Sequence, residues 1–199
     1  MTLDIRLERW SEPDRPLLER LNAPEMTEHL GGPEAPDALE RRHRRYAENA
    51  DSDSVYIFRI MGGADRIPVG SISFWERDWQ GEAVYEIGWG VLPEHQGRGI
   101  GSRAVALAVD LAAGLGRRDA MHAFPGIDNL ASNGICRKVG FTLLGECDFE
   151  YPKGRWMRCN DWRISLRKQD PSPDRGGLGG RPHPLRHQPE RPPPWGEVD

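Results

Sequence analysis

The chain has 199 residues, of which 37% are hydrophobic and 29% charged, a composition typical of one globular domain. Its formal net charge of −4 provides no general positive field that would attract nucleic acid or a membrane surface. Its apolar stretches fall far short of the roughly 20 residues that a membrane helix needs, and the charged N-terminus does not resemble a signal peptide. We therefore expect a cytoplasmic protein that binds neither nucleic acid nor a membrane.

Two smaller features agree with a cytoplasmic globular protein. Cys136, Cys147 and Cys159 form no CxxC pair and are odd in number, which indicates reduced thiols rather than a disulfide framework. The strongly basic run ERRHRRY, from Glu40 to Tyr46, is interpreted as the solvated face of a helix, with a phosphate-binding patch as the alternative.

The first half of the chain combines helices with strands. A strand is expected near Leu3–Glu8. Three helices are expected next, at Pro13–Leu21, Pro24–Leu30 and Asp37–Asn49. Prolines favour the starts of the first two. Three strands are then expected, at Val55–Ile60, Val69–Trp75 and Ala83–Val91. The glycine-bearing segments between these strands predict antiparallel hairpins.

The second half contains a crossover. A helix from Gly99 to about Leu115 is expected to end at Gly114 and Gly116, because glycine is favoured at helix C-termini. The remaining elements are a strand, a helix and two strands, expected at Ala120–Phe124, Asn129–Val139, Thr142–Tyr151 and Met157–Leu166. This order predicts an α/β (α+β) fold with a mixed, mostly antiparallel central sheet and helices on both faces.

The composition changes after Lys168. Residues 169–199 contain eight prolines and five glycines, and such a segment buries too little apolar surface to offset the entropy of ordering it. We expect a folded domain over residues 1–168 and a disordered tail over 169–199. The PERPPPW end of the tail is a candidate polyproline II ligand, although an end without a partner is the preferred interpretation.

The most informative segment is VLPEHQGRGIGSRAV, residues 91–105. Its alternate glycines, Gly97, Gly99 and Gly101, lead directly into an apolar helix. Glycines permit close backbone approach, the first amides of a helix have no partner within it, and the helix dipole favours an anion there. Arg98 and Arg103 can add positive charge, and the Ser102 hydroxyl can add a hydrogen bond. The segment therefore predicts a diphosphate site, with a purely structural turn as the alternative.

Two common phosphate motifs do not fit this segment. A Walker A loop needs a lysine after its last glycine, and none is present. A dinucleotide fingerprint needs G-x-G-x-x-G, whereas Ser102 occupies the last position. The preceding strand also belongs to an antiparallel meander, unlike the first strand of a Rossmann fold.

Two blocks resemble a known family. QGRGIG, residues 96–101, resembles the Q/R-x-x-G-x-G/A acetyl-CoA signature of the GNAT superfamily of N-acetyltransferases. NLASNGICRKVGF, residues 129–141, is similar to the later N-x-x-S…K-x-G-F block of that family. The resemblance covers roughly residues 3–167 and is closest to the branch with ribosomal-protein N-terminal acetyltransferases. It implies an acyltransferase that moves an acetyl group from acetyl-CoA to a primary amine of a protein N-terminus or small molecule.

Two other interpretations of the function are left open. The chain could be a non-catalytic acyl-CoA-binding regulatory domain, or an interaction module that acts through its proline-rich end. No metal is expected, and a homodimer is left open.

The resemblance assigns acetyl-CoA binding to one strand end, to the loop of alternate glycines that leads into the helix (called the glycine loop below) and to a later helix start. The residues are Trp89, Gly90, Val91, Gln96, Gly97, Arg98, Gly99, Ile100, Gly101, Ser102 and Asn129. A backbone amide of the strand end would stabilise the oxyanion. Gly88 and Gly90 weaken regular pairing there, which would let the pantetheine arm bind like an added strand; a β-bulge is compatible with the same glycines. Asn129 can also cap its helix.

The catalytic candidates are Glu86, Ser132 and Cys136. Glu86 alternates with Gly88 and Gly90 along the strand and is the candidate general base; an ordinary polar strand residue is the alternative. Many relatives carry a tyrosine where this chain has Cys136, so the general acid is left open between Ser132, Cys136 and solvent.

The acceptor side is only outlined by the sequence. Asp148 and Glu150 are candidates to hold a cationic acceptor, and Trp79 is a candidate to line its cleft. The region that contains Met26, Glu28 and His29 resembles the part of these enzymes that covers the acceptor.

Overall fold

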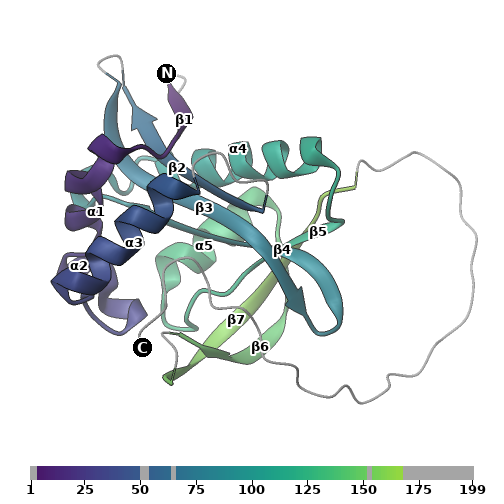
Figure 1. Cartoon of the computed structure of the whole chain (residues 1–199). Helices are drawn as coiled ribbons and strands as arrows, with labels where there is room; N and C mark the ends of the chain where they lie inside the picture. The colour runs from purple at the N-terminus through teal and green to yellow at the C-terminus, as the bar shows by residue number, and fades with distance from the viewer. Residues whose placement is uncertain (1–3, 50–53, 64–65, 152–153, 168–199) are drawn as a thin grey trace, which may run out of the picture.

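Seven strands form one sheet in the order β1-β2-β3-β4-β5-β7-β6 in a computed structural model of the chain (Figure 1). The structure describes residues 4–49, 54–63, 66–151 and 154–167. The strands are β1 Ile5–Arg9, β2 Val55–Gly62, β3 Ile67–Trp79, β4 Glu82–Val91, β5 Ala120–Ala123, β6 Thr142–Glu150 and β7 Trp156–Ser165. Among these described strands only the β4–β5 pair is parallel, which confirms the mixed, mostly antiparallel sheet.

The α-helices are α1 Arg15–Leu21, α2 Pro24–Thr27, α3 Pro36–Glu48, α4 Ile100–Leu115 and α5 Leu130–Val139. Figure 1 shows α1, α2 and α3 on one face of the sheet and α4 and α5 on the other, as predicted. The first two helices are shorter than expected, because 3-10 turns occupy Glu12–Asp14 and Glu28–Leu30. Gly114 lies inside α4, and Gly116 ends the helix in the left-handed conformation, φ 64°.

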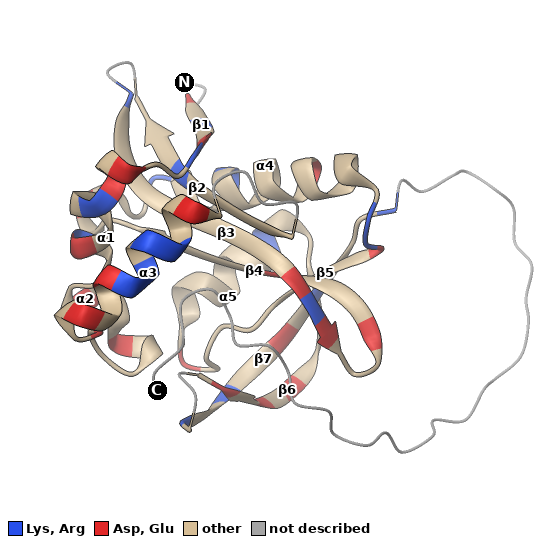
Figure 2. Cartoon of the chain, in the orientation of Figure 1, with Lys and Arg blue, Asp and Glu red and all other residues tan. Residues whose placement is uncertain are grey.

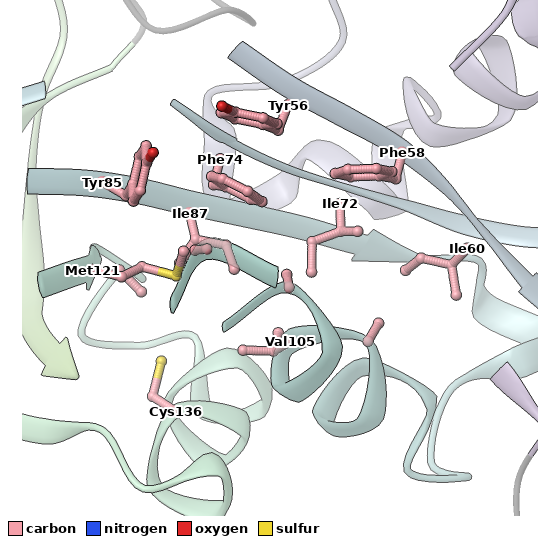
Figure 3. Packing of buried hydrophobic residues seen from close by; sticks show 14 of the residues in the cluster. Tyr56, Phe58, Ile60, Ile72, Phe74, Tyr85, Ile87, Val105, Met121 and Cys136 are labelled. Carbon is pink, nitrogen blue, oxygen red and sulfur yellow. The ribbon is translucent and has the colours of Figure 1, made fainter. Parts of the chain in front are cut away.

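The larger core lies between the sheet and α4. Tyr56 stacks on Phe74 with ring centroids 4.5 Å apart, and Tyr85 meets Phe74 edge-on at 5.1 Å. Val105 of α4 is fully buried in the same cluster (Figure 3). Burying each such side chain stabilises the fold by about 1.5–3 kcal/mol. Because Tyr85 faces α4, its strand neighbour Glu86 faces the opposite side of the sheet.

A second core cluster holds the α1–α3 layer against that opposite face: Trp10, Leu17, Leu18, Leu39, Tyr46, Ile57 and Leu92. The basic run of α3 is not wholly solvated, since His43 and Tyr46 are buried. Its arginines lie beside acidic groups: Arg42 is 3.2 Å from Glu34 and Arg41 is 2.9 Å from Asp37. Figure 2 shows acidic segments toward both ends of α3 and basic segments between them, so the basic run has acidic neighbours on its own helix.

Across the described residues, no helix is both long and apolar enough to span a membrane. The expected tail, residues 169–199, lies outside the described residues. The domain limits at residue 168 therefore stay a prediction.

Candidate active site

The two parallel strands diverge at the centre of the sheet. β4 and β5 pair only through Tyr85↔Met121 and Glu86↔His122, whereas β4 pairs with β3 in unbroken register up to Val91. Within the described part of the chain, β4 from residue 87 onward therefore has no β5 partner, and its free edge can bond an extended ligand. The expected loss of pairing at residues 89–91 affects this edge alone, and the register with β3 contains no bulge.

The glycine loop connects the end of β4 to α4. Gly97 and Gly99 adopt left-handed conformations, with φ 70° and 81°, which glycine enters without steric cost. The Arg103 amide donates to the Gly99 carbonyl at 3.1 Å and closes the first turn of α4. The preceding amides thus point out of the helix end, where the dipole of this 16-residue helix favours an anion.

Three of the predicted cofactor residues also have structural roles. A Cβ on Gly101 would lie 2.7 Å from Cδ1 of Ile135, so Gly101 allows α4 and α5 to pack closely. Ile100 is 6% exposed and anchors the loop in the core. Gln96 Nε2 donates to the Val91 carbonyl at 2.8 Å and ties the loop to the end of β4.

Cationic side chains gather around the loop. Arg98 and Arg103 are exposed, and Ser102 is half-buried. Lys138 reaches the loop from α5, because a Cβ on Gly99 would lie 3.9 Å from its Nζ. The sequence identified Lys138 only as part of a motif, since its place beside the loop depends on how α4 and α5 pack.

The start of α5 matches its predicted cap. Asn129 Oδ1 accepts from the Ser132 amide at 3.0 Å, which confirms the capping role. Ser132 itself is half-buried. Cys136, one turn further along, is fully buried with Val105 and Met121 (Figure 3), and burial raises the pKa of its thiol to about 12. These observations favour a packing role for Cys136 over that of a proton donor.

Glu86 lies on the face opposite α4 and is 3% exposed. It forms an ion pair with Nη1 of Arg77. The Arg77 guanidinium also lies over three aromatic rings, at 5.3 Å from Trp79, 5.6 Å from Phe124 and 4.7 Å from Phe149. Trp79, Phe124 and Phe149 are called the aromatic cluster below.

The region that contains Met26 and His29 lies beside the end of β4. A Cβ on Gly90 would lie 3.2 Å from Leu21 Cδ2 and 3.4 Å from Met26 Cε, so the α1–α2 region packs over this face of β4. His29 Nδ1 is 3.4 Å from Asp128 Oδ1, which links the same region to the loop before α5. The face with Glu86 is therefore enclosed from the side opposite the α4 core.

The acidic pair on β6 is arranged differently from the expectation. Phe149 belongs to the aromatic cluster, so its neighbours Asp148 and Glu150 point to the opposite face. Asp148 is 3.0 Å from Arg158, and Glu150 accepts from the Gly154 amide at 2.7 Å; both are exposed. The structure therefore separates these carboxylates from Glu86.

A profile of the acetyltransferase (GNAT) domain matches residues 4–142. The chain belongs to the GNAT acetyltransferase family. It is therefore an enzyme of the acyltransferase class, as the two sequence blocks implied. A sequence comparison with curated proteins finds no match.

Solved structures of several acetyltransferases share the fold. The ribosomal-protein-S5-alanine acetyltransferase from Vibrio fischeri has a TM-score of 0.69 at 16% identity, over 86% of this chain and 98% of that one. A spermidine N-acetyltransferase from Vibrio cholerae, in complex with CoA and spermine, has a TM-score of 0.68 at 16% identity, over 81% and 95%. An aminoglycoside acetyltransferase in complex with coenzyme A has a TM-score of 0.65 at 19% identity, over 81% and 95%.

Several residues near Glu86, on the face opposite α4, were missed from sequence. Arg77, His122, Asp161 and Tyr151 come from four different strands or strand ends, and no local motif links them. Tyr151 is 6% exposed; its pKa is raised, chiefly by burial, and nearby charges that include Glu86 contribute. Only alternation along each strand could have indicated which of these side chains share a face.

Proposed function

We propose that the chain transfers an acetyl group from acetyl-CoA to a primary amine of a small molecule or protein N-terminus. The observation that carries the proposal is the junction where β4 leaves β5 and continues through the glycine loop into α4. The free edge at the end of β4 and the start of α4, which favours an anion, are separated by only a few residues. We further propose a cytoplasmic location, which the free thiols of Cys136, Cys147 and Cys159 fit.

In this proposal the diphosphate of CoA binds the helix start and its loop. The residues concerned are Gly97, Arg98, Gly99, Ile100, Gly101 and Ser102. Gln96 holds the loop in place through the Val91 carbonyl. The pantetheine arm extends along the free edge at Trp89, Gly90 and Val91, where a backbone amide stabilises the oxyanion, and Asn129 borders the arm from α5.

The chemistry requires a neutral amine and a proton for the departing thiolate. Two roles are open to Glu86. It can accept a proton from the amine, or, held by Arg77, it can keep a negative charge beside the acceptor cation; an adjacent guanidinium favours the charged form of a carboxylate. Ser132 or solvent supplies the proton to the thiolate in either case. The buried position of Cys136 makes it a weaker candidate for this proton donor.

The first experiment measures binding and turnover on the full chain. Acetyl-CoA should raise the melting temperature, by an amount that corresponds to about 2.7 kcal/mol at a hundredfold excess over its dissociation constant. Release of free CoA is then followed with peptides that have a free N-terminus, spermidine, an aminoglycoside and amino acids. The absence of a thermal shift with millimolar acetyl-CoA would refute the proposal. Binding without turnover of any amine would favour the alternative, a non-catalytic acyl-CoA-binding domain.

A further inference from the structure

His122 and His43 are both almost fully buried, with 3% and 2% exposure. Their hydrogen bonds, however, place the ring proton on different nitrogens. His43 Nδ1 accepts from Trp10 Nε1 at 3.4 Å, so the proton of the neutral His43 ring lies on Nε2. His122 Nδ1 lies 2.7 Å from Asp161 Oδ1. Since an ionised carboxylate can only accept, His122 carries its proton on Nδ1, and Nε2 of the neutral ring keeps a lone pair.

The His122 ring is held in one orientation. The other oxygen of Asp161 accepts from Trp79 Nε1 at 2.9 Å, so both carboxylate oxygens have partners. Phe124 stacks on the imidazole with ring centroids 5.9 Å apart and an angle of 21°. A carboxylate that fixes Nδ1–H makes the opposite nitrogen the basic atom and stabilises the imidazolium when it forms.

His122 also lies where the two parallel strands part. It is the β5 partner of Glu86, in the last described pair before β4 and β5 diverge. Tyr85 and Met121 of the preceding pair belong to the α4 core, so Glu86 and His122 both face the side that α1 and α2 cover. Glu86 is already ion-paired with Arg77, whereas Nε2 of His122 has no hydrogen-bond partner within the described residues.

We propose that Nε2 of His122 accepts the proton of the acceptor ammonium, with Asp161 and Trp79 as positioning residues. This inference rests on the acetyl transfer proposed above. The N–H bond of the ammonium breaks as the Nε2–H bond forms, and Asp161 balances the charge of the imidazolium. The freed lone pair forms the C–N bond to the thioester carbonyl carbon. The C–S bond then breaks, the nitrogen loses its second proton to solvent, and the sulfur takes one from solvent, directly or through Ser132, which yields the amide and the thiol of CoA.

The kinetic test uses whichever amine of the panel (peptide N-terminus, spermidine, aminoglycoside or amino acid) the wild-type chain acetylates. His122→Asn should keep the acetyl-CoA thermal shift and lower kcat at neutral pH by about 10²-fold or more. The loss should shrink as the pH rises, because more of the amine is then neutral without help. His43→Asn is the matched control: it removes an equally buried imidazole, so it should lower the melting temperature and leave the pH dependence of kcat unchanged. A wild-type kcat for His122→Asn at neutral pH would overturn the proposal.

A second readout needs no acceptor. Nitrogen NMR of the 15N-histidine-labelled full chain should show protonated Nδ1 and unprotonated Nε2 for His122, and the opposite for His43. Charged groups on the same face as His122 come from three strands: Asp161 and Arg163, its direct cross-strand partner, on β7, Glu86 on β4 and Arg77 on β3. The spectrum is therefore also recorded for Asp161→Asn. That variant should lose the Nδ1–H preference together with turnover. A proton on Nε2 of wild-type His122 would refute the inference even if acetyl transfer is observed. Absence of acetyl-CoA binding and turnover would instead refute the proposed function.

Discussion

At the scale of single residues, the buried pair of Glu86 and Arg77 allows a prediction about stability. Replacing Glu86 by Gln removes the charge that balances the guanidinium, so we expect a loss of about 1.5–3 kcal/mol, the range for a hydrogen bond to a charged group. Arg77→Met in the same chain should recover part of that loss, because an apolar side chain then replaces the guanidinium that has lost its carboxylate. Thermal unfolding of the two single variants and the double variant gives the coupling between the residues. Additive losses would contradict a direct interaction.

Cys136 allows a prediction about pH. Burial raises the pKa of its thiol from an ordinary 9.0 to about 12, so above pH 9 the unfolded chain loses a proton that the folded chain keeps. The unfolded state then binds fewer protons, and the free energy of unfolding falls as the pH rises from 9 towards 12. The melting temperature of Cys136→Ala should therefore depend less on pH in this range than that of the wild type. Turnover at neutral pH should change little, and a large loss would return Cys136 to the list of proton donors.

At the scale of elements, the glycine loop can be tested with a matched control. Gly97 in the loop and Gly63 in the β2–β3 hairpin have φ values of 70° and 77°, and a Cβ on either would meet no atom within 4 Å. Alanine should cost each of them about 1–2 kcal/mol of backbone strain. Only Gly97→Ala should weaken CoA binding in isothermal titration, because only its new methyl group points into the proposed phosphate site. Equal CoA affinity in both variants would contradict the assignment of the loop.

Gly101 is unsuitable for that comparison, although the sequence alone gave it the same role as Gly99. Its added Cβ would press on Ile135 of α5, so a substitution there would disturb the packing of two helices as well as any ligand. The sequence could predict the order from β3 to α4, because turn glycines, strand alternation and a helix start are local signals. It could not predict that His122 meets Asp161, 39 residues later, since that contact depends on β7 inserting between β5 and β6.

At the scale of the whole molecule, the sheet separates two tasks. The layer of α4 and α5 borders the glycine loop, and the layer of α1–α3 encloses the face with Glu86 and His122. The divergence of β4 from β5 connects the two sides through the sheet. In the proposed reaction, a thioester that lies along the free edge of β4 can therefore meet an amine from the other side. This arrangement explains why the proposed CoA-binding residues had a sequence motif while the proposed acceptor face did not. Local backbone geometry makes the first site, and only tertiary packing assembles the second.

The last prediction concerns where the folded unit ends. Leu166 is the final residue of the larger core, 6% exposed, and its amide donates to the Asp119 carbonyl at 2.9 Å. A chain that ends at Lys168 keeps these contacts and should retain the melting temperature and the acetyl-CoA affinity of the full chain. A chain that ends at Ile164 loses Leu166, which contributes about 1.5–3 kcal/mol through burial, and should melt several degrees lower. If the chain that ends at Lys168 melts as low as the shorter one, residues 169–199 contribute to the fold, and the predicted domain limit is wrong.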